Sequence, residues 1–354
     1  MRKRIALWGV AAGTVIGLFM PTAALAAAGP NGTNITTSPV SSVLHVAPGK
    51  SITTTLSVQN NAAKPIDIEL QLQTFKPYGK NGRAQVVPPK PGSDFVNWVR
   101  FSQTSFTAQP GEWQKIQMTI SPPPTAALDY YYAVLVKPAV TTASGKTNTL
   151  KGYNAILILL NVDSPNAKPQ ITVTNFSSLH GLYEYLPATF NITAKNTGNI
   201  FLAPSGDVYI SKSSDFSHTI DTIPVNTAQG NVIPGSSRIF PAQWNNGFPL
   251  FAPKTVGGQP ITDKTGTTIQ HLSWDFTQAN KFRFGKYYAK MVFVYNNGQR
   301  DVPISAVVSF WVIPWKLGLL VLLFVGLCMF GLYSGGRKLA AKTAGLSKKA
   351  KKHE

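Results

Sequence analysis

Cysteine and acidic residues are scarce in this chain. One of its 354 residues is cysteine, Cys328, and 14 are Asp or Glu against 33 Lys or Arg, so the formal net charge is +19. A single cysteine excludes an intrachain disulfide, and with it the class of small secreted domains that disulfides hold together. The excess of cations gives a surface that attracts anionic polymers and lipid headgroups.

Motifs of catalysis and of metal binding are also missing. His45, His180, His218 and His271 stand apart from one another, and none belongs to a His-Glu-x-x-His or similar ligand spacing. The chain also lacks a glycine-rich phosphate loop, a Gly-x-Ser-x-Gly nucleophile turn and a Ser-x-x-Lys motif. We therefore expect no metal, no cofactor and no enzymatic activity.

Helical patterns are absent between residues 36 and 310, where apolar residues alternate with polar ones instead. Leu56 and Val58 lie on one face of one expected strand, and Ile68 and Leu70 lie on one face of the next. Turn-forming residues join these strands, so we expect an antiparallel pair with one buried face. Short strands separated by turns indicate an all-β sandwich. Further strands are expected over residues 95–101, 113–120, 130–137 and 153–162.

The pattern of strands and turns occurs twice. A polar run with two prolines, residues 163–170, separates the copies, and a linker, residues 29–39, precedes the first. Both copies have an Asn-rich turn, a Pro-Gly turn and an aromatic strand in the same order: residues 53–70, 110–111 and 129–136 match residues 187–199, 234–235 and 285–292. We expect two tandem immunoglobulin-like β-sandwiches, residues 40–162 and 171–310.

A long apolar run lies at each end of the chain. Residues 1–28 begin with cations, continue with an uncharged core and end in small residues, which is the layout of a secretory signal peptide. An uncleaved N-terminal anchor is the alternative. Residues 317–333 carry no charge, and with the residues before them they are long enough for a single transmembrane helix over residues 311–333.

Aromatic and charged residues flank this helix. Trp311, Trp315 and Tyr333 are expected at the two membrane interfaces, with the ammonium of Lys316 reaching the headgroups. The tail, residues 334–354, carries seven Lys or Arg, so the positive-inside rule places it in the cytoplasm and the β-domains outside. The tail either only fixes this topology or also lies along the anionic inner leaflet. A large external part without disulfides is typical of a bacterial surface, where nucleic acid is not an expected partner.

The best candidate for ligand binding is the long connection over residues 75–93. It holds Tyr78, Lys80, Arg83 and Lys90 among Gly, Asn and Pro residues. Cations and an aromatic ring on a loop carried by a rigid sheet can bind an anionic ligand. A solvated basic loop without a ligand is the alternative.

Nearly the whole chain resembles the WxL-interacting proteins of Gram-positive bacteria, which combine a signal peptide, two such domains, one transmembrane helix and a basic tail. The resemblance is carried by LHVAPG at 44–49, FTAQPGE at 106–112, YYYAVL at 130–135, NTGN at 196–199 and FGKY at 284–287. It implies a first domain that binds peptidoglycan, a second that binds a host or matrix protein, and WxL-domain proteins as partners. The chain departs from the family at Ala127-Leu128-Asp129, where the family often has a glycine before the aromatic strand.

The sequence thus predicts a single-pass protein of the bacterial cell membrane that displays two immunoglobulin-like modules outside the cell. Their expected ligand is a cell-wall polymer, either peptidoglycan or an anionic wall polymer, or another surface or host protein. The alternative is an accessory spacer subunit of a membrane complex, whose helix binds a partner helix through Gly318, Gly326 and Gly331.

Overall fold

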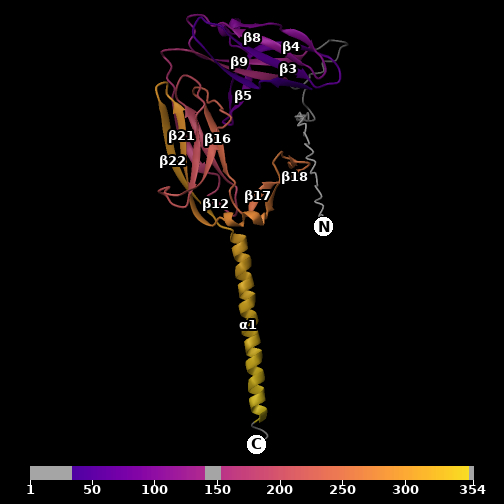
Figure 1. Ribbon diagram of the computed structural model, residues 1–354, viewed down its shortest axis with the longest axis vertical. Coiled ribbons are helices and arrows are strands. Elements are labelled where there is room, and N and C mark those ends of the chain that lie inside the picture. The colour runs from indigo at the N-terminus through magenta and orange to yellow at the C-terminus, as the bar shows by residue number, and fades with distance from the viewer. Residues whose placement is uncertain (1–33, 140–152, 351–354) are drawn as a thin grey trace, which may run out of the picture.

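Two β-domains and a C-terminal helix follow one another along an elongated molecule (Figure 1). The structure, a computed structural model, describes residues 34–139 and 153–350, with the side chains of the helix described as far as Lys338. The expected signal peptide over residues 1–28 lies outside the described residues. Domain 1 lies across one end of domain 2, and the helix leaves domain 2 from the opposite end.

Domain 1 is a sandwich of two sheets. One sheet has the strand order β1, β3, β8, β6, and the other has the order β2, β10, β9, β4, β5, with β7 also paired to β4. Strand β2 runs parallel to β10, whereas β10 and β9 are antiparallel. This order is that of an immunoglobulin-like sandwich. The bounds are β1 Ile35–Ser38, β2 Ser41–Val46, β3 Ile52–Asn60, β4 Ile66–Tyr78, β5 Arg83–Val87, β6 Val99–Phe101, β7 Ser105–Ala108, β8 Trp113–Ile120, β9 Leu128–Pro138 and β10 Asn154–Val162.

Domain 2 repeats this plan without counterparts of β6 and β7. Its sheets have the orders β11, β13, β16 and β12, β22, β21, β14, β15, and again the short strand β12 runs parallel to the last strand, β22. The all-β class with two immunoglobulin-like sandwiches that the sequence predicts is therefore confirmed. The bounds are β11 Ile171–Ser178, β12 Leu182–Tyr183, β13 Ala188–Asn196, β14 Ser205–Ser211, β15 Thr219–Val225, β16 Ser237–Trp244, β21 Gly285–Asn296 and β22 Asp301–Val312.

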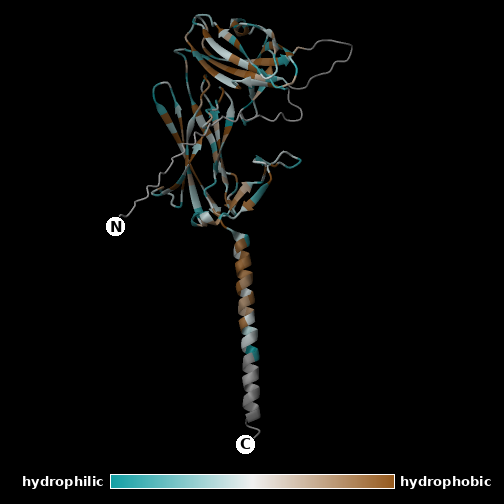
Figure 2. Ribbon diagram, turned by 45° about the vertical axis from the view of Figure 1, so that its right-hand side comes forward, coloured by the Kyte–Doolittle hydropathy of each residue, from teal (hydrophilic) through white to brown (hydrophobic). Residues whose placement is uncertain are grey.

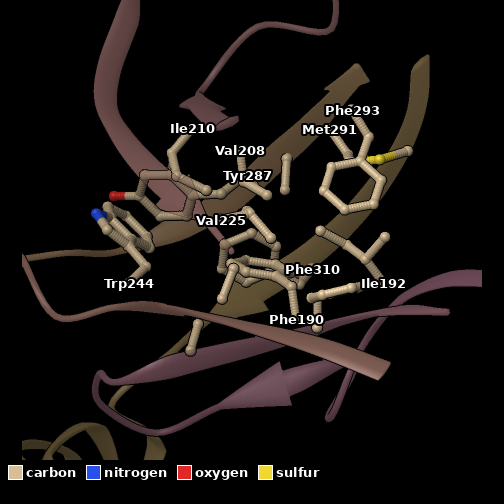
Figure 3. Packing of buried hydrophobic residues seen from close by; sticks show 14 of the residues in the cluster. Phe190, Ile192, Val208, Ile210, Val225, Trp244, Tyr287, Met291, Phe293 and Phe310 are labelled. Atoms are coloured by element: carbon tan, nitrogen blue, oxygen red, sulfur yellow. The ribbon is translucent and has the colours of Figure 1, made fainter. Parts of the chain in front are cut away.

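The core of domain 2 lies between its two sheets. Phe190 of β13 lies against Phe310 of β22 with ring centroids 5.2 Å apart, and Trp244 of β16 lies beside Tyr287 of β21 at one end of the core (Figure 3). The Trp244 ring centroid lies 5.1 Å from that of Tyr287 and 6.0 Å from that of Phe310. At about 25 cal/mol for each Å² of apolar surface removed from water, such side chains dominate the stabilisation of the domain. Domain 1 has an equivalent core of its own.

A buried asparagine ends the same strand in both domains. Asn60 at the end of β3 and Asn196 at the end of β13 have no exposed surface. In each case Nδ2 donates to the carbonyl oxygen four residues on at 2.7 Å, and to a distant one, that of Ala108 at 3.0 Å or Val232 at 2.8 Å. Each Oδ1 accepts the backbone N–H two residues on. In each repeated Asn-rich turn, the asparagine amide is thus buried with its hydrogen bonds satisfied, and it fixes where the chain leaves one sheet.

Three expectations about the strands differ from the structure. Strands β3 and β4 do not form a hairpin, because β3 lies in one sheet and β4 in the other. Their alternation identifies a buried face in each, but those faces meet across the sandwich instead of side by side. Residues 95–101 begin as a 3₁₀ helix, η1 (Asp94–Trp98), and only the last three form β6. The stretch over residues 29–39, expected to be a linker, contains β1.

The C-terminal helix α1 (Trp315–Ala350) is long and apolar enough to span a membrane over Trp315–Lys338. Those 24 residues reach about 36 Å, against a hydrocarbon core of about 30 Å. None of their most apolar window is buried against the rest of the described chain, unlike the core helix of a soluble protein. Figure 2 shows hydrophobic residues along the half of α1 nearest domain 2. The helix begins later than residue 311, because β22 continues to Val312.

Domain 2 differs from domain 1 mainly in one connection. Residues 121–127 join β8 to β9 in domain 1, whereas residues 245–284 join β16 to β21 in domain 2. We call residues 245–284 the foot, because its strand β17 lies at the end of domain 2 from which α1 leaves (Figure 1). The foot contains β17 Leu250–Pro253, β18 Thr255–Val256, β19 Gln259–Pro260, β20 Gln270–Ser273 and the 3₁₀ helix η2 Phe276–Lys281.

Candidate binding site between the two domains

Strands β4 and β5 form a hairpin, and β5 lies where the two domains meet (Figure 1). Tyr78 pairs with Arg83, and the turn between them contains Gly79 and Gly82 with φ of +64° and +70°, a conformation that favours glycine. The expectation of an open loop over residues 75–93 was therefore wrong for residues 75–87. Pro77 does not interrupt this hairpin, because it lies beyond the last residue of β4 that pairs with β9, where its missing N–H breaks no ladder on that side.

The tip of the hairpin is fastened to domain 2. The N–H of Ile239 in β16 donates to the carbonyl oxygen of Lys80 at 2.7 Å. The guanidinium of Arg238 lies against Gly82 and Gly230, and a Cβ atom at either glycine would overlap it. Two glycines thus leave the space in which an arginine of domain 2 lies under the hairpin of domain 1.

An apolar seam continues this contact between the domains. Phe75, Ala133 and Leu159 of domain 1 pack with Phe201 of domain 2, and all four are buried. Ile233 of domain 2 is half-buried against the same cluster. Apolar burial of this kind opposes hinge motion between neighbouring domains.

Asp129, in β9, is the polar centre of the seam. Its carboxylate accepts hydrogen bonds from the N–H of Phe201 across the interface, from the Tyr131 hydroxyl at 3.0 Å and from Asn161 Nδ2 at 2.8 Å. Burial raises the pKa of Asp129 above its ordinary value, by more than these hydrogen bonds lower it. Burial and the nearby Asp129 also raise the pKa of Tyr131, so its hydroxyl stays protonated and donates.

A cavity of about 270 Å³ opens between the hairpin and β16. Arg83 and Arg238 line it together with small residues and with apolar side chains such as Phe75 and Leu157, and no Asp or Glu is among the lining residues. Burial lowers the pKa of Arg238, yet a guanidinium stays charged in proteins. One of its nitrogens donates to the carbonyl oxygen of Asn231 at 3.0 Å.

Among the described residues, neither cavity arginine has a carboxylate partner. In the part of the chain that the structure describes, the one ion pair joins Lys316 to Glu184, at the other end of domain 2. Arg238 is half-buried and Arg83 is exposed. A guanidinium without a carboxylate partner retains its capacity to bind an anion, and a concave site with few polar groups is the usual form of a ligand pocket. The cavity is therefore chemically suited to one anionic group.

The structure separates the four residues that the sequence singled out. Arg83 lines the cavity, and Lys80 contributes its carbonyl oxygen to the interdomain contact. Tyr78 is exposed on the hairpin and Lys90 is exposed in the loop before η1, and neither is a lining residue. Arg238 was missed, because its sequence context marks only a strand after a Pro-Gly turn and nothing in its spacing indicates a contact with domain 1.

The four expected membrane-interface residues lie at different places around the start and along the length of α1. Trp315 begins the helix, and Trp311 lies just before it in β22, both with exposed rings. The ammonium of Lys316 pairs with Glu184 Oε2 at 2.7 Å and lies 5.3 Å from the Trp315 ring centroid. Tyr333 is exposed further along the helix, where Arg337 donates to its hydroxyl at 3.5 Å.

The histidines do not gather into a metal site. Among the described residues, no three His, Cys, Asp or Glu side chains are close enough to hold a metal ion. His45 lies 6.1 Å from the Phe201 ring and His180 lies 5.4 Å from the Tyr183 ring, so both pack against aromatic side chains.

No family model and no curated protein matches this chain. Among solved structures, the class 5 fimbriae chaperone CfaA is 16% identical over 78% of this chain and 99% of its own, with a TM-score of 0.34. A chain of the CsuC-CsuE chaperone–tip adhesion subunit pre-assembly complex of Acinetobacter baumannii is 11% identical over 77% of this chain and 97% of its own, with a TM-score of 0.33. A PapD-like domain of human CEP192 is 15% identical over 44% of this chain and 99% of its own, with a TM-score of 0.27. The chain is similar to PapD-like, immunoglobulin-like domains in fold, and these similarities say nothing of what it binds.

Proposed function

We propose that this protein is a non-enzymatic surface protein of a bacterial cell membrane, whose two domains together bind an anionic cell-wall polymer. The observation that supports it most is the cavity between the domains, which no described Asp or Glu lines and where Arg83 and Arg238 have no carboxylate partner among the described residues. Wall polymers present repeated phosphate or carboxylate groups, and a guanidinium binds either with two parallel hydrogen bonds.

The cations around α1 support an orientation with the domains outside the cell. Arg337 and Lys338 follow the apolar part of the helix, and five further lysines follow them in the sequence. At the other end, the charge of Lys316 is neutralised by its ion pair with Glu184. The bias in cations therefore favours a cytoplasmic C-terminus, in agreement with the signal peptide expected over residues 1–28.

The size of the cavity limits what it can hold. A pocket for a drug-sized ligand has a volume of about 300 to 1,000 Å³, whereas this cavity has about 270 Å³. It therefore takes one charged group with part of its sugar, and the rest of a polymer would run along the outside of the hairpin, past the exposed Tyr78 and Lys80.

Peptidoglycan and WxL-domain proteins are the partners that the sequence resemblance implies, and peptidoglycan is the competing ligand in the test of the proposal. The spacer-subunit alternative has weaker support. At about 100° of rotation per residue, Gly326 lies about 80° around the helix from Gly318, and Gly331 about 140° further. Three glycines so placed do not form the single face that close helix packing requires.

The test is co-sedimentation of the full chain, in detergent micelles, with purified Gram-positive cell walls. We expect Arg83→Gln to weaken binding about tenfold, because a charge-assisted hydrogen bond contributes about 1.5 to 3 kcal/mol. Lys90→Gln is the matched control, since it removes one exposed cation of domain 1 outside the cavity and should leave binding unchanged. Walls stripped of their anionic polymers should no longer bind the protein. Binding that survives both Arg83→Gln and the stripping contradicts the proposal and identifies peptidoglycan as the ligand.

A further inference from the structure

The foot exposes aromatic side chains at the end of domain 2 from which α1 leaves. Trp274, Phe276, Phe282 and Phe284 all have exposed rings, and Phe276 is 72% exposed. A water-soluble surface seldom gathers several large apolar side chains, and where it does they mark a site of contact.

The strand register places part of this aromatic surface beside the start of the helix. Gly285, the first residue of β21, pairs with Val312, the last residue of β22, and Lys286 pairs with Trp311. Phe282 and Phe284 come just before β21, so they lie at the level where the chain passes from β22 into α1. This is the level of the membrane surface for a helix that crosses from Trp315.

Side-chain contacts connect the foot to the first turn of α1. Lys316 pairs with Glu184. Tyr185, which follows Glu184, packs its ring against that of Trp274 with centroids 6.3 Å apart. Trp274 in turn stacks on Phe276 with centroids 6.2 Å apart. The aromatic surface and the helix therefore belong to one continuous structure.

Hydrogen bonds hold the foot in this conformation. Asp275 caps η2 by accepting the N–H of Thr277 at 3.1 Å, and the N–H of Phe248 donates to the carbonyl oxygen of Lys281 at 3.0 Å. The Phe248 ring also packs against that of Phe276, with centroids 5.4 Å apart. The exposed rings are thus fixed in place and do not fold back into the domain.

The charge of the same segment is positive. Residues 274–286 contain one acid, Asp275, against the cations Lys281, Arg283 and Lys286. Exposed aromatic rings interleaved with Lys and Arg are the composition of protein surfaces that lie in the headgroup layer of a membrane.

We propose that residues 274–284 of the foot lie in the headgroup layer of the membrane that α1 crosses, with the rings of Trp274 and Phe276 at the boundary of the acyl chains. The helix and the foot are then two points of contact, which together fix the tilt of both domains on the membrane. The inference depends on α1 crossing the membrane, as the proposed function requires, and on nothing about the ligand.

The test uses the full chain reconstituted into vesicles of phosphatidylcholine and phosphatidylglycerol, with a fluorescent maleimide at one cysteine. The native Cys328 in α1 reports on the helix. Phe276→Cys and Val256→Cys, each combined with Cys328→Ser, report on the foot. Val256 is the matched control because it belongs to the same segment and is 68% exposed, while its hairpin, β18–β19, rises away from α1 (Figure 1).

We expect lipids with a shallow quenching group to remove most of the fluorescence at position 276, and aqueous iodide to quench position 256 instead. Deep lipid quenchers should act at Cys328. If position 276 responds to iodide as position 256 does, or is shielded from iodide without any quenching by lipid, as under a second copy of the chain, the inference is wrong. A Cys328 label that lipid quenchers do not reach would overturn the proposed membrane anchoring itself, so the two failures are distinguishable.

Discussion

Replacing Asn196 by alanine should lower the free energy of unfolding of domain 2 by about 3 kcal/mol, because it leaves buried polar groups without partners at about 1 to 3 kcal/mol each. The side chain has no exposed surface and makes three hydrogen bonds to backbone groups, among them the carbonyl oxygens of Ile200 and Val232. No water can replace these bonds without opening the turn. Asn60→Ala should destabilise domain 1 in the same way, since its bonds match those of Asn196.

The measurement is hydrogen exchange of β13 and β16 in the full chain in detergent micelles at increasing urea concentration. Exchange resolves the two domains, which a single unfolding curve of a two-domain protein does not. Asn296→Ala is the control, because Asn296 also accepts the N–H two residues on, that of Gly298 at 2.7 Å, but is exposed. We expect it to cost under about 1 kcal/mol. Equal effects of the Asn196 and Asn296 substitutions would show that burial of the amide contributes nothing.

The sequence predicted the elements whose signals are local. Strand β8 has the expected bounds, Trp113–Ile120, and the repeat of the Asn-rich turn located both buried asparagines. Such signals depend on the alternation of buried and exposed side chains and on backbone hydrogen bonds within a turn, so they can be read from neighbouring residues. Within Ala127-Leu128-Asp129, just before the aromatic residues of β9, Leu128 adopts φ of +65°, a conformation that favours glycine.

The sequence could not show which elements meet. Alternation assigns a buried face to β3 and to β4, but it does not decide whether those faces belong to one sheet or to two facing sheets. For the same reason Arg83 was found as a cation in a long connection, whereas Arg238, far along the chain, was not found as its neighbour. The contact between Lys80 and Ile239 is visible only once both domains are folded.

The foot was missed although the sequence carried a signal for it. Between residues 245 and 284 cations lie among the aromatic residues, as Lys281 and Arg283 do beside Phe282 and Phe284. Aromatic rings interleaved with Lys and Arg are typical of surfaces that contact a membrane. Comparison of the two repeats would also have located the segment, because the connection that it occupies spans only residues 121–127 in domain 1.

Replacing Asp129 by alanine should open the seam between the domains, and we expect the Phe201 N–H to exchange about 100-fold faster. The carboxylate is the acceptor for that N–H, for the Tyr131 hydroxyl and for Asn161 Nδ2, and unmet buried donors cost about 1 to 3 kcal/mol each. Asp129→Asn is the control. Its oxygen can still accept from Phe201 and Tyr131, and the amide of Asn161 can turn to present its own oxygen, so the loss should be far smaller.

The same pair of proteins tests the pH dependence of the seam. Burial raises the folded-state pKa of Asp129, so its contribution to stability is fully present below the unfolded value of about 4 and is lost as the pH rises through the raised folded value. From neutral pH toward pH 4, the seam of the wild type should therefore strengthen relative to that of Asp129→Asn, which does not titrate. Charged His45 lowers the pKa of Asp129, so both proteins should carry His45→Gln to remove that opposing effect. Comparing Phe201 exchange in the two proteins at each pH cancels the intrinsic pH dependence of exchange. We expect the exchange rate of the Asp129→Asn protein, divided by that of the wild type, to rise toward acid pH. A ratio that stays constant or falls would mean that the three hydrogen bonds outweigh the cost of burying the charge.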